Sequence, residues 1–517
     1  MKEDLIIVSV AHNYHDSNLS ISRGSQILFS LEAERFFRSK KIQASPSQIK
    51  LLVNYALHEV NLKMSDVDYF VLGALNNPYE QNQNTIAADL RISGSEVMGL
   101  NIPTLTIRHH LGHAGHYYFS DFDDALIASC DGGGDQGERV VYFKGNDLQI
   151  ERIEFNTEYH ISTKPYGQFA AFIYGRGFCE GRLMALASYG KRNVELFTRV
   201  SNLFHQLKEV TFKEGQETIK EAFPEYCDLN LNEHFDDFAN LGWAIQEKFT
   251  SERLANIKSV YQEQESSNLV LVGGSALNIH TNSAIYSEVS ENIYIPPNCD
   301  DTGIAVGQNA VAIAHLLKVR PEVILPYSGF EPTDINRNSK TLIIEDLAEA
   351  AMRIRNGELC LAHIGRPEVG PRALGHRSFL FRPNDIELKK IVSEKIKGRE
   401  WYRPVAPVIL EEDLKNYFGP GPSTSKYMLF QYQANDQFKQ LFPGIAHSDN
   451  SVRVQSIGET DCQIIRILLQ HYKQLTGHGV LINTSLNLNN EPLANSLWDT
   501  QEIARKIHVP NFILRND

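Results

Sequence analysis

The sequence predicts an α/β fold whose N-terminal part contains one strand unit twice. Residues 5–11 read as a buried strand, and residues 18–31 read as a hairpin that follows an acidic turn. Residues 125–130 repeat the buried strand, and residues 139–155 repeat the hairpin beyond the glycine-rich turn 131–135. Because the two units share the same order of elements, we infer an internal duplication.

A third strand, residues 268–272, leads into Gly273 and Gly274 and then into the start of a helix. Paired glycines at this place let backbone N–H groups approach a ligand closely. Two strand–turn–hairpin units followed by a strand–glycine–helix loop resemble the layout of the actin, sugar-kinase and heat-shock ATPase superfamily. We therefore expect a duplicated actin-like domain with an adenosine loop.

The rest of the chain divides into a helical stretch and a second domain. Residues 191–265 show helical apolar periodicity and no obvious chemistry, so we interpret them as packing elements. Residues 321–338 are polar and interrupted by prolines, which is typical of a crossing segment. We predict an N-terminal domain over residues 1–340 and a C-terminal α/β domain over residues 341–517, with a strand at residues 359–364.

Composition limits the classes of partner. The chain has 517 residues, and 50 Lys and Arg against 63 Asp and Glu give a formal net charge of −13. Nucleic acid or an anionic membrane would require a basic face, so neither is expected. The six cysteines form no CxxC pair, which is typical of reduced thiols. No apolar run approaches the length of a membrane span, so we expect a cytoplasmic protein.

Four histidines lie within residues 109–116. On a helix, His109 and His113 share one face at the i, i+4 spacing, which allows two imidazoles to bind one metal. His110 and His113 form a competing pair at i, i+3. The missing ligands should be carboxylates, and the candidates are Asp131, Asp300 and Asp301. Two histidines with carboxylates suit iron, manganese or zinc, and the spacing does not choose among them.

Basic residues on glycine-rich loops indicate an anion pocket. The loop 365–378 carries three arginines, and the segment 395–404 adds further positive charge. Arg453, and Ser485 after an apolar strand, complete the set. A single arginine would be read as a surface ion pair, but several on glycine-rich loops favour phosphate binding. In the first unit, the basic segment 34–41 follows a strand where phosphate-binding groups tend to lie in this fold.

Together these segments resemble the O-carbamoyltransferase family, which includes nodulation-factor, cephamycin, novobiocin and tobramycin carbamoyltransferases. The matching motifs of the first half are Tyr14-His15-Asp16-Ser17, Glu34-Arg35-Phe36, His109-His110, His113-Ala114, Asp131-Gly132, Glu180-Gly181 and Gly273-Gly274. Those of the second half are Gly365-Arg366, Gly370-Pro371-Arg372, Arg377-Ser378, Arg403-Pro404, Arg453-Val454-Gln455 and Asn483-Thr484-Ser485. The resemblance covers most of the chain.

The resemblance implies two catalytic domains. The N-terminal one is similar to the tRNA threonylcarbamoyl transferase, and the C-terminal one is similar to threonylcarbamoyl-adenylate synthase. In such enzymes carbamoyl phosphate and ATP give carbamoyl-adenylate in the C-terminal domain, with release of phosphate and pyrophosphate. The carbamoyl group then passes to an acceptor hydroxyl at a metal site in the N-terminal domain.

The resemblance also assigns residues. The metal ligands would be His109, His113, Asp131 and Asp301, with Fe²⁺ as the expected ion and Asp300 as an alternative ligand. His15 and Lys40 would contact the carbamoyl or phosphate groups, with Lys41 as an alternative to Lys40. The nucleotide in the N-terminal domain would be bound by Gly132, Glu180, Gly181, Gly273, Gly274 and Asn278. Carbamoyl phosphate and ATP, with Mg²⁺, would be held by Arg372, Lys397, Arg453 and Ser485.

Two departures from the family pattern lie in the nucleotide loop, where Arg182 stands in place of the usual Lys and Ala185 in place of Gly. The expected acceptor is a small natural-product or sugar-like molecule, as in secondary metabolism. The sequence does not decide whether the chain forms a homodimer. Two other functions are considered: an actin-like ATPase or kinase, which would not need the histidine cluster, and a non-catalytic nucleotide-binding regulator, which would not need both polar sites.

Overall fold

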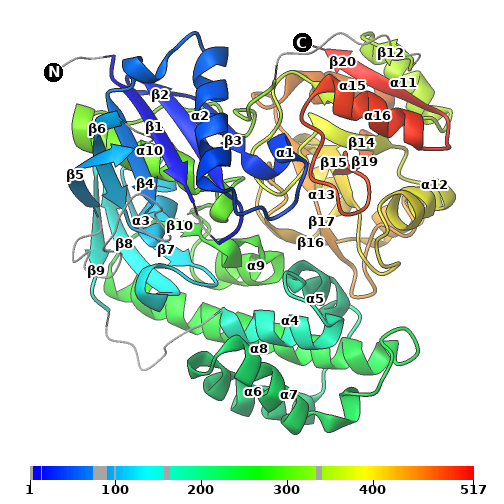
Figure 1. The fold of residues 1–517 in the computed structure, drawn as a ribbon. Helices are drawn as coiled ribbons and strands as arrows, with labels where there is room; N and C mark the ends of the chain where they lie inside the picture. The colour runs from blue at the N-terminus through cyan, green and yellow to red at the C-terminus, as the bar shows by residue number, and fades with distance from the viewer. Residues whose placement is uncertain are drawn as a thin grey trace.

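The structure is a computed structural model that describes residues 4–12, 14–73, 90–97, 100–155, 163–332 and 341–516. Figure 1 shows two sheets in the N-terminal half, a layer of helices below them, and a C-terminal α/β unit beside them. Among the described residues, no helix is both long enough and apolar enough to cross a membrane.

The two N-terminal sheets share a topology of five strands, to which the first sheet adds a sixth. The first contains β1 (Ile6–Ala11), β2 (Asn18–Arg23), β3 (Gln26–Glu32), β4 (Tyr69–Gly73), β5 (Leu90–Val97) and β6 (Leu100–Ile107), in the order β3-β2-β1-β4-β6-β5. The second contains β7 (Asp124–Cys130), β8 (Val140–Asn146), β9 (Gln149–Ile153), β10 (Leu269–Val272) and β11 (Ile293–Tyr294), in the order β11-β10-β7-β8-β9. Each sheet joins an antiparallel three-stranded meander to two further strands parallel to its first strand, and in the first sheet β5 is added antiparallel to β6. The predicted duplication is therefore confirmed.

Helices α3 (His109–Ala114) and α10 (Ile304–Leu317) share one apolar core with both sheets. They approach closely because glycines face each other. A Cβ atom on Gly115 would overlap the backbone of Gly307, and one on Gly307 would overlap the carbonyl of Gly112. This close contact brings the start of α10 next to the histidines of α3. On the outer faces, the first sheet packs against α2 (Pro46–Glu59) and the second against α8 (Phe235–Glu263) and α9 (Ile279–Glu288).

The stretch expected to be helical is helical and forms a core of its own. Its helices, with two that precede it, are α4 (Lys164–Tyr174), α5 (Glu180–Ala187), α6 (Val194–Glu209), α7 (Phe212–Ala222) and α8 (Phe235–Glu263). Buried aromatic and aliphatic side chains such as Phe169, Phe204 and Phe223 join them. Figure 1 shows this layer beneath both halves of the molecule.

The C-terminal unit is a mixed sheet of seven strands. They are β12 (Ile343–Ile344), β13 (Leu359–Ile364), β14 (Arg377–Phe381), β15 (Ala406–Leu410), β18 (Gln455–Ile457), β19 (Val480–Ser485) and β20 (Asn511–Asn516), in the order β12-β20-β13-β14-β19-β15-β18. Helices α11 (Leu347–Arg355) and α15 (Gln463–Thr476) pack on one face, and α16 (Leu497–Lys506) packs on the other. Smaller elements are α12 (Ile386–Lys390), α13 (Leu414–Tyr417), α14 (Asp436–Leu441), β16 (Gln431–Gln433) and β17 (Ser451–Arg453). The strand predicted at residues 359–364 is confirmed as β13, whereas the predicted boundary at residue 340 lies outside the described residues.

A short helix, α1 (Ala33–Phe37), ties the first sheet to the C-terminal unit. The buried guanidinium of Arg35 donates to Glu32 Oε2 at 2.9 Å, to the Gly370 carbonyl at 2.7 Å, and to the Glu368 carbonyl. The Gly370 N–H donates in return to Glu32 Oε1 at 3.0 Å. Burial raises the pKa of Glu32 to about 8, although the Arg35 charge opposes this shift. Glu32 and Arg35 together therefore fix the loop that carries Arg372.

Replacing Arg35 by Ala is expected to lower the free energy of unfolding by about 3 kcal/mol, because three hydrogen bonds of a buried charge are lost together. Urea unfolding followed by circular dichroism measures the effect. Arg23→Ala, at an exposed strand end, serves as the matched control and should change the unfolding free energy little. Equal stability of R35A and the unmodified chain would contradict the assigned role.

Candidate active site

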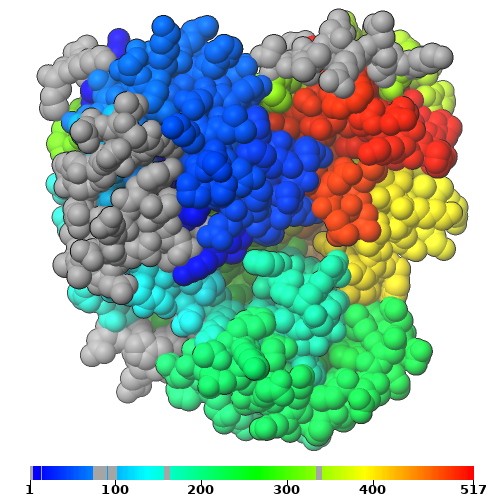
Figure 2. Space-filling view, viewed as in Figure 1, coloured from blue at the N-terminus to red at the C-terminus, as the bar shows by residue number. Residues whose placement is uncertain are grey.

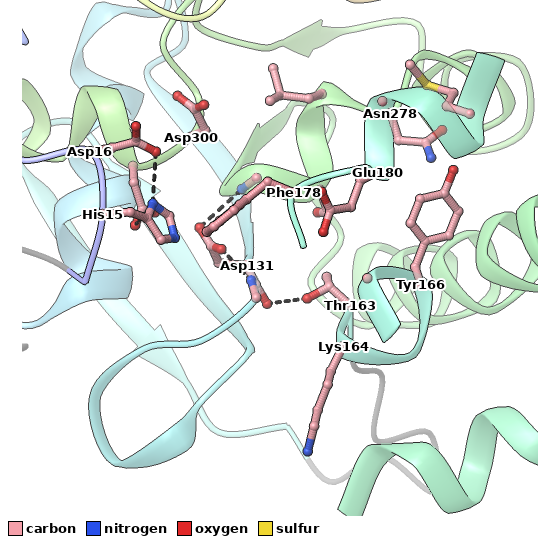
Figure 3. Close-up of a pocket in the computed structure, with 18 of the residues that line it drawn as sticks. His15, Asp16, Asp131, Thr163, Lys164, Tyr166, Phe178, Glu180, Asn278 and Asp300 are labelled. Carbon is pink, nitrogen blue, oxygen red and sulfur yellow. Dashed lines mark hydrogen bonds and ion pairs between the residues drawn. The ribbon is translucent and has the colours of Figure 1, made fainter. Parts of the chain in front are cut away.

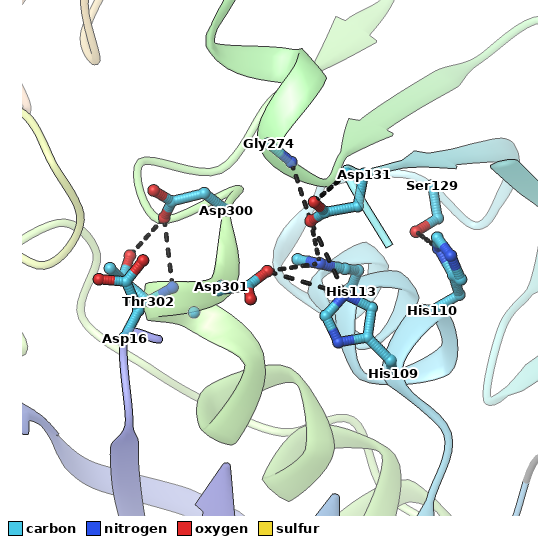
Figure 4. A network of polar contacts seen from close by, with 12 residues as sticks. Asp16, His109, His110, His113, Ser129, Asp131, Gly274, Asp300, Asp301 and Thr302 are labelled. Atoms are coloured by element: carbon cyan, nitrogen blue, oxygen red, sulfur yellow. Dashed lines mark hydrogen bonds and ion pairs between the residues drawn. The ribbon is translucent and has the colours of Figure 1, made fainter. Parts of the chain in front are cut away.

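Two histidines and two aspartates come together where the two N-terminal sheets meet (Figure 4). His113 Nε2 lies 2.9 Å from Asp131 Oδ2 and 3.5 Å from Asp301 Oδ1. His109 Nε2 lies 3.7 Å from each of the same two oxygens. One potential ligand atom from each residue lies within 4.8 Å of all the others. The sequence had named these four residues as one group, and the fold assembles them.

Local structure decides which neighbours join this group. The His109 N–H donates to Asp135 Oδ2 at 2.6 Å, which fixes the start of α3. His110 turns the other way, with Nδ1 2.8 Å from Ser129 Oγ, and burial together with the neighbouring histidines lowers its pKa to about 3. Asp300 instead accepts a 2.5 Å hydrogen bond from the Thr302 hydroxyl. His110 and Asp300, the two alternatives, therefore lie outside the group.

The four residues fit a divalent metal ion. Among the described residues, neither ring nitrogen of His109 has a hydrogen-bond partner although both are buried. Burial disfavours a charge on His113, yet hydrogen bonds to Asp131 and Asp301 raise its pKa to about 9. A divalent cation would replace that proton between two imidazoles and two carboxylates, a donor set suited to iron, manganese or zinc.

A cavity of about 400 Å³ opens beside this group (Figure 3). Four of the residues that line it, which we call the reactive wall, are His15, Asp16, Asp131 and Asp301. Five of the six residues expected to bind nucleotide also line it, namely Gly132, Glu180, Gly181, Gly274 and Asn278. Apolar side chains complete the wall, namely Tyr166, Met184, Phe249 and Leu277. Apolar surface beside glycine backbone suits a flat heterocycle such as adenine.

The sixth of these residues, Gly273, is not among those that line the cavity. Its φ of 87° and its close approach to the Cys130 backbone leave no room for a Cβ atom. It therefore serves the turn rather than the ligand. The following Gly274 N–H donates to Asp131 Oδ2 at 3.2 Å, so the glycine loop is joined directly to the histidine–aspartate group.

Asp16 couples His15 to Lys41. Its buried Oδ2 lies 2.9 Å from His15 Nδ1 and accepts from Lys41 Nζ at 2.5 Å. Burial alone would lower the pKa of His15, but the hydrogen bond to Asp16 and the charge of Asp301 outweigh it and raise the pKa. Lys41 and Asp16 line both this cavity and a second one, whereas Lys40 lines the second of the two.

The second cavity, of about 420 Å³, lies between the N-terminal unit, the loop before α5 and the C-terminal unit. Figure 2 shows the blue, turquoise and orange-to-yellow parts of the chain meeting on this face. Predicted residues on its wall are Lys40, Arg372, Lys397 and Ser485. Basic residues that the sequence analysis had not selected are Arg176, Arg182, Arg399 and Arg403. This concentration of positive charge suits a polyphosphate.

Arg453, also predicted for this site, is not among the residues that line the cavity, but it lies near Arg372, Arg399 and Arg403, which line it. Burial and the charges of Arg372, Arg399 and Arg403 hold its pKa well below the usual range. Burial and the neighbouring Arg403 and Arg372 likewise lower the pKa of Arg399 to about 9. Mutual repulsion of this kind is relieved when an anion binds between the guanidinium groups.

Lys397 has a different environment. Its buried ammonium donates to the Ser485 hydroxyl at 2.9 Å, to the Ser485 carbonyl at 2.5 Å and to Asn487 Oδ1 at 2.6 Å. Burial holds its pKa well below the usual range, with Arg399 and Lys40 adding to the shift. Lys397 therefore shapes the loop after β19 and orients the Ser485 hydroxyl.

The two departures in the nucleotide loop have structural explanations. Arg182 forms an ion pair with Glu400 Oε1 at 2.5 Å and so joins α5 to the C-terminal unit. Ala185 is buried in the helical core. Arg399 and Arg403 lie two and six residues beyond Lys397, and this basic spacing was the available signal for them.

Comparison with known proteins decides the family. The description "Carbamoyltransferase N-terminus" matches residues 6–92 and 75–310, and "Carbamoyltransferase C-terminus" matches residues 351–516. The chain belongs to the carbamoyltransferase family. The predicted family and enzyme class are thereby confirmed.

Relatives of this carbamoyltransferase include uncharacterised and nodulation proteins. An uncharacterised protein of Synechocystis is 27% identical over 99% of this chain and 96% of its own length. The nodulation protein NolNO of Sinorhizobium fredii is 26% identical over 94% of this chain and 76% of its own length. Among solved structures, full-length HypF has a TM-score of 0.34 at 15% identity, covering 61% of this chain and 56% of its own.

Proposed function

We propose that this carbamoyltransferase makes carbamoyl-adenylate in the second cavity and transfers the carbamoyl group to an acceptor hydroxyl in the first. The observation that carries the proposal is the pairing of two adjoining cavities with different chemistry. One is lined by arginines and lysines, and the other joins a glycine loop to a histidine–aspartate group. In this account residues 341–517 form the adenylate and residues 1–340 perform the transfer.

In the first step water cleaves carbamoyl phosphate to carbamate and inorganic phosphate. A carbamate oxygen then attacks the α-phosphorus of ATP, the bond from that phosphorus to its bridging oxygen breaks, and pyrophosphate leaves. Arg372, Arg399 and Arg453 bind the phosphates and offset the charge that accumulates on the leaving group. The Ser485 hydroxyl, held by Lys397, donates to a phosphate oxygen. Mg²⁺ would accompany ATP here.

In the second step the acceptor oxygen attacks the carbamoyl carbon, the bond from that carbon to the AMP oxygen breaks, and AMP leaves. His15 is the proposed proton acceptor, because Asp16 holds Nδ1 and leaves Nε2 for the acceptor hydroxyl. In an alternative role it polarises the carbamoyl carbonyl. Lys41 offsets charge on the AMP phosphate, a role for which the sequence had favoured Lys40.

His109, His113, Asp131 and Asp301 would hold the metal, with Fe²⁺ as the proposed ion. When bound, a divalent metal supplies a Lewis acid for the oxygens of the leaving phosphate. The acceptor is proposed to be a small molecule of natural-product or sugar-like chemistry. We also propose a cytoplasmic location, because all six cysteines are free.

Addition of Fe²⁺ under anaerobic conditions is expected to raise the midpoint of thermal unfolding by about 3 °C, because the ion binds the folded chain in preference to the unfolded chain. His113→Ala should remove the shift, since it deletes one of four ligands. Differential scanning fluorimetry with and without a chelator measures both. A shift of equal size in H113A would place the bound ion elsewhere.

Mass spectrometry of reaction products identifies the acceptor. Purified enzyme, ATP and carbamoyl phosphate are added to a small-molecule cell extract, and products are searched for the mass of one added carbamoyl group. We expect at least one product whose formation requires both cosubstrates. Products that form without ATP would contradict the adenylate route.

A further inference from the structure

Phe178 stands at the boundary between the two cavities. Few residues line both, and Phe178 is one of them, together with Asp16, Lys41, Gly181, Asp300 and Arg372. Its ring meets the His15 ring edge-to-face at 5.1 Å, and Lys41 Nζ lies 5.6 Å from its centroid. Figure 3 shows the ring beside His15 at the reactive wall. One apolar side chain therefore contacts two polar groups of the proposed transfer site.

The backbone that carries this ring is strained and loosely enclosed. Phe178 has a φ of 58°, in the left-handed region that bulky residues rarely adopt. Gly175, with a φ of 67°, and Gly177 precede it in the short loop between α4 and α5. No described atom lies within 4 Å of a Cβ position built on either glycine. Phe178 is 62% exposed, so little packing holds the ring in place.

From this placement we propose that Phe178 is the gate through which the intermediate passes from the second cavity to the first. The proposal rests on the proposed function, since it concerns the passage of carbamoyl-adenylate. In the closed position the ring packs against the His15 ring at the boundary between the two cavities. Such a gate opens only when a ligand binds the conformation with the ring displaced more tightly than the conformation with the ring against His15.

Carbamoyl-adenylate provides this difference in affinity between the two conformations. Carbamoyl-adenylate carries a negative phosphate, and its pairing with the Lys41 ammonium is stronger than the contact of that ammonium with an aromatic face. Arrival of the phosphate at Lys41 therefore displaces the ring. After transfer the ring returns to His15. The open positions at Gly175 and Gly177, which precede Phe178, give the ring room to move.

Loss of the ring should let the intermediate escape to water. Released carbamoyl-adenylate hydrolyses to AMP and carbamate, so a leaky variant forms AMP without an acceptor. We expect Phe178→Ala to raise acceptor-free AMP release in the presence of ATP and carbamoyl phosphate by about 2- to 10-fold, the factor that corresponds to one aromatic contact. The pyrophosphate burst of the first turnover should stay the same.

The test uses ¹⁴C-labelled carbamoyl phosphate and ATP without acceptor, followed by rapid gel filtration. The unmodified enzyme should carry label through the column, and F178A should lose most of it to the small-molecule fraction. Phe178→Tyr keeps the ring and should retain label. Phe178→Leu keeps apolar bulk without the ring and should lose label, which preserves the test if F178A folds poorly.

The outcomes separate the gate from the function on which it rests. Label retention by F178A and F178L equal to that of the unmodified enzyme would overturn the gate. Loss of the pyrophosphate burst in F178A would also overturn it, because Phe178 would then serve adenylate formation. Absence of carbamoyl-phosphate-dependent pyrophosphate release from the unmodified enzyme would instead overturn the proposed function.

Discussion

Replacement of His113 by Ala is expected to reduce carbamoyl transfer by at least about 10³-fold, while pyrophosphate release that depends on carbamoyl phosphate continues. His113 makes the shortest contact of the histidine–aspartate group, at 2.9 Å from Asp131 Oδ2. Its loss would remove a metal ligand at the transfer site. The proposed ATP-binding residues Arg372, Arg399 and Arg453 are not part of the histidine–aspartate group, so adenylate formation should continue.

Labelled carbamoyl phosphate measures transfer, and a coupled pyrophosphate assay measures adenylate formation in the same sample. His110→Gln is the matched control, because His110 lies on the same helix but turns toward Ser129. The metal content should fall in H113A and persist in H110Q. Normal transfer by H113A would show that the metal assignment is wrong.

Replacement of Arg453 by Ala is expected to abolish adenylate formation itself, with carbamoyl-phosphate-dependent pyrophosphate release falling by about 10³-fold. Arg453 is half-buried near Arg372, Arg399 and Arg403, and its charge repels theirs. Such an arrangement is stabilised by a bound polyanion, so we expect Arg453 to contact phosphate. Both steps should fail in R453A, in contrast to H113A.

The control is Arg505→Ala, which removes an exposed arginine paired with Glu502 on α16. It should retain full pyrophosphate release. The Michaelis constant for ATP distinguishes binding from catalysis in any residual activity of R453A. Unchanged pyrophosphate release by R453A would contradict a role in adenylate formation.

Local patterns predicted the fold well. The strand–turn–hairpin unit depends on short-range alternation and turn residues, so its two copies could be read from the sequence and reappear as β1–β3 and β7–β9. The i, i+4 spacing of His109 and His113 is also local. The preference for Asp301 over Asp300 came from the family resemblance, and in the structure Asp300 instead accepts a hydrogen bond from the Thr302 hydroxyl.

Contacts between residues far apart in the chain could not be predicted from the sequence. Arg35 lies 333 residues before Glu368, and its partners are backbone carbonyls that carry no residue-specific pattern. Arg399 and Arg403 belonged to a segment recognised as basic, but only the fold reveals that they face Arg372 and Lys40 across one cavity. Phe178 could not be selected either, because its position depends on a left-handed backbone conformation.

The central claim is that this carbamoyltransferase activates the carbamoyl group through AMP. Purified enzyme is incubated with ATP, with and without carbamoyl phosphate, and the nucleotide products are separated by chromatography. The account predicts AMP and pyrophosphate in equal amounts, and only when carbamoyl phosphate is present. Formation of ADP at a rate independent of carbamoyl phosphate would contradict it and would favour an actin-like ATPase or kinase.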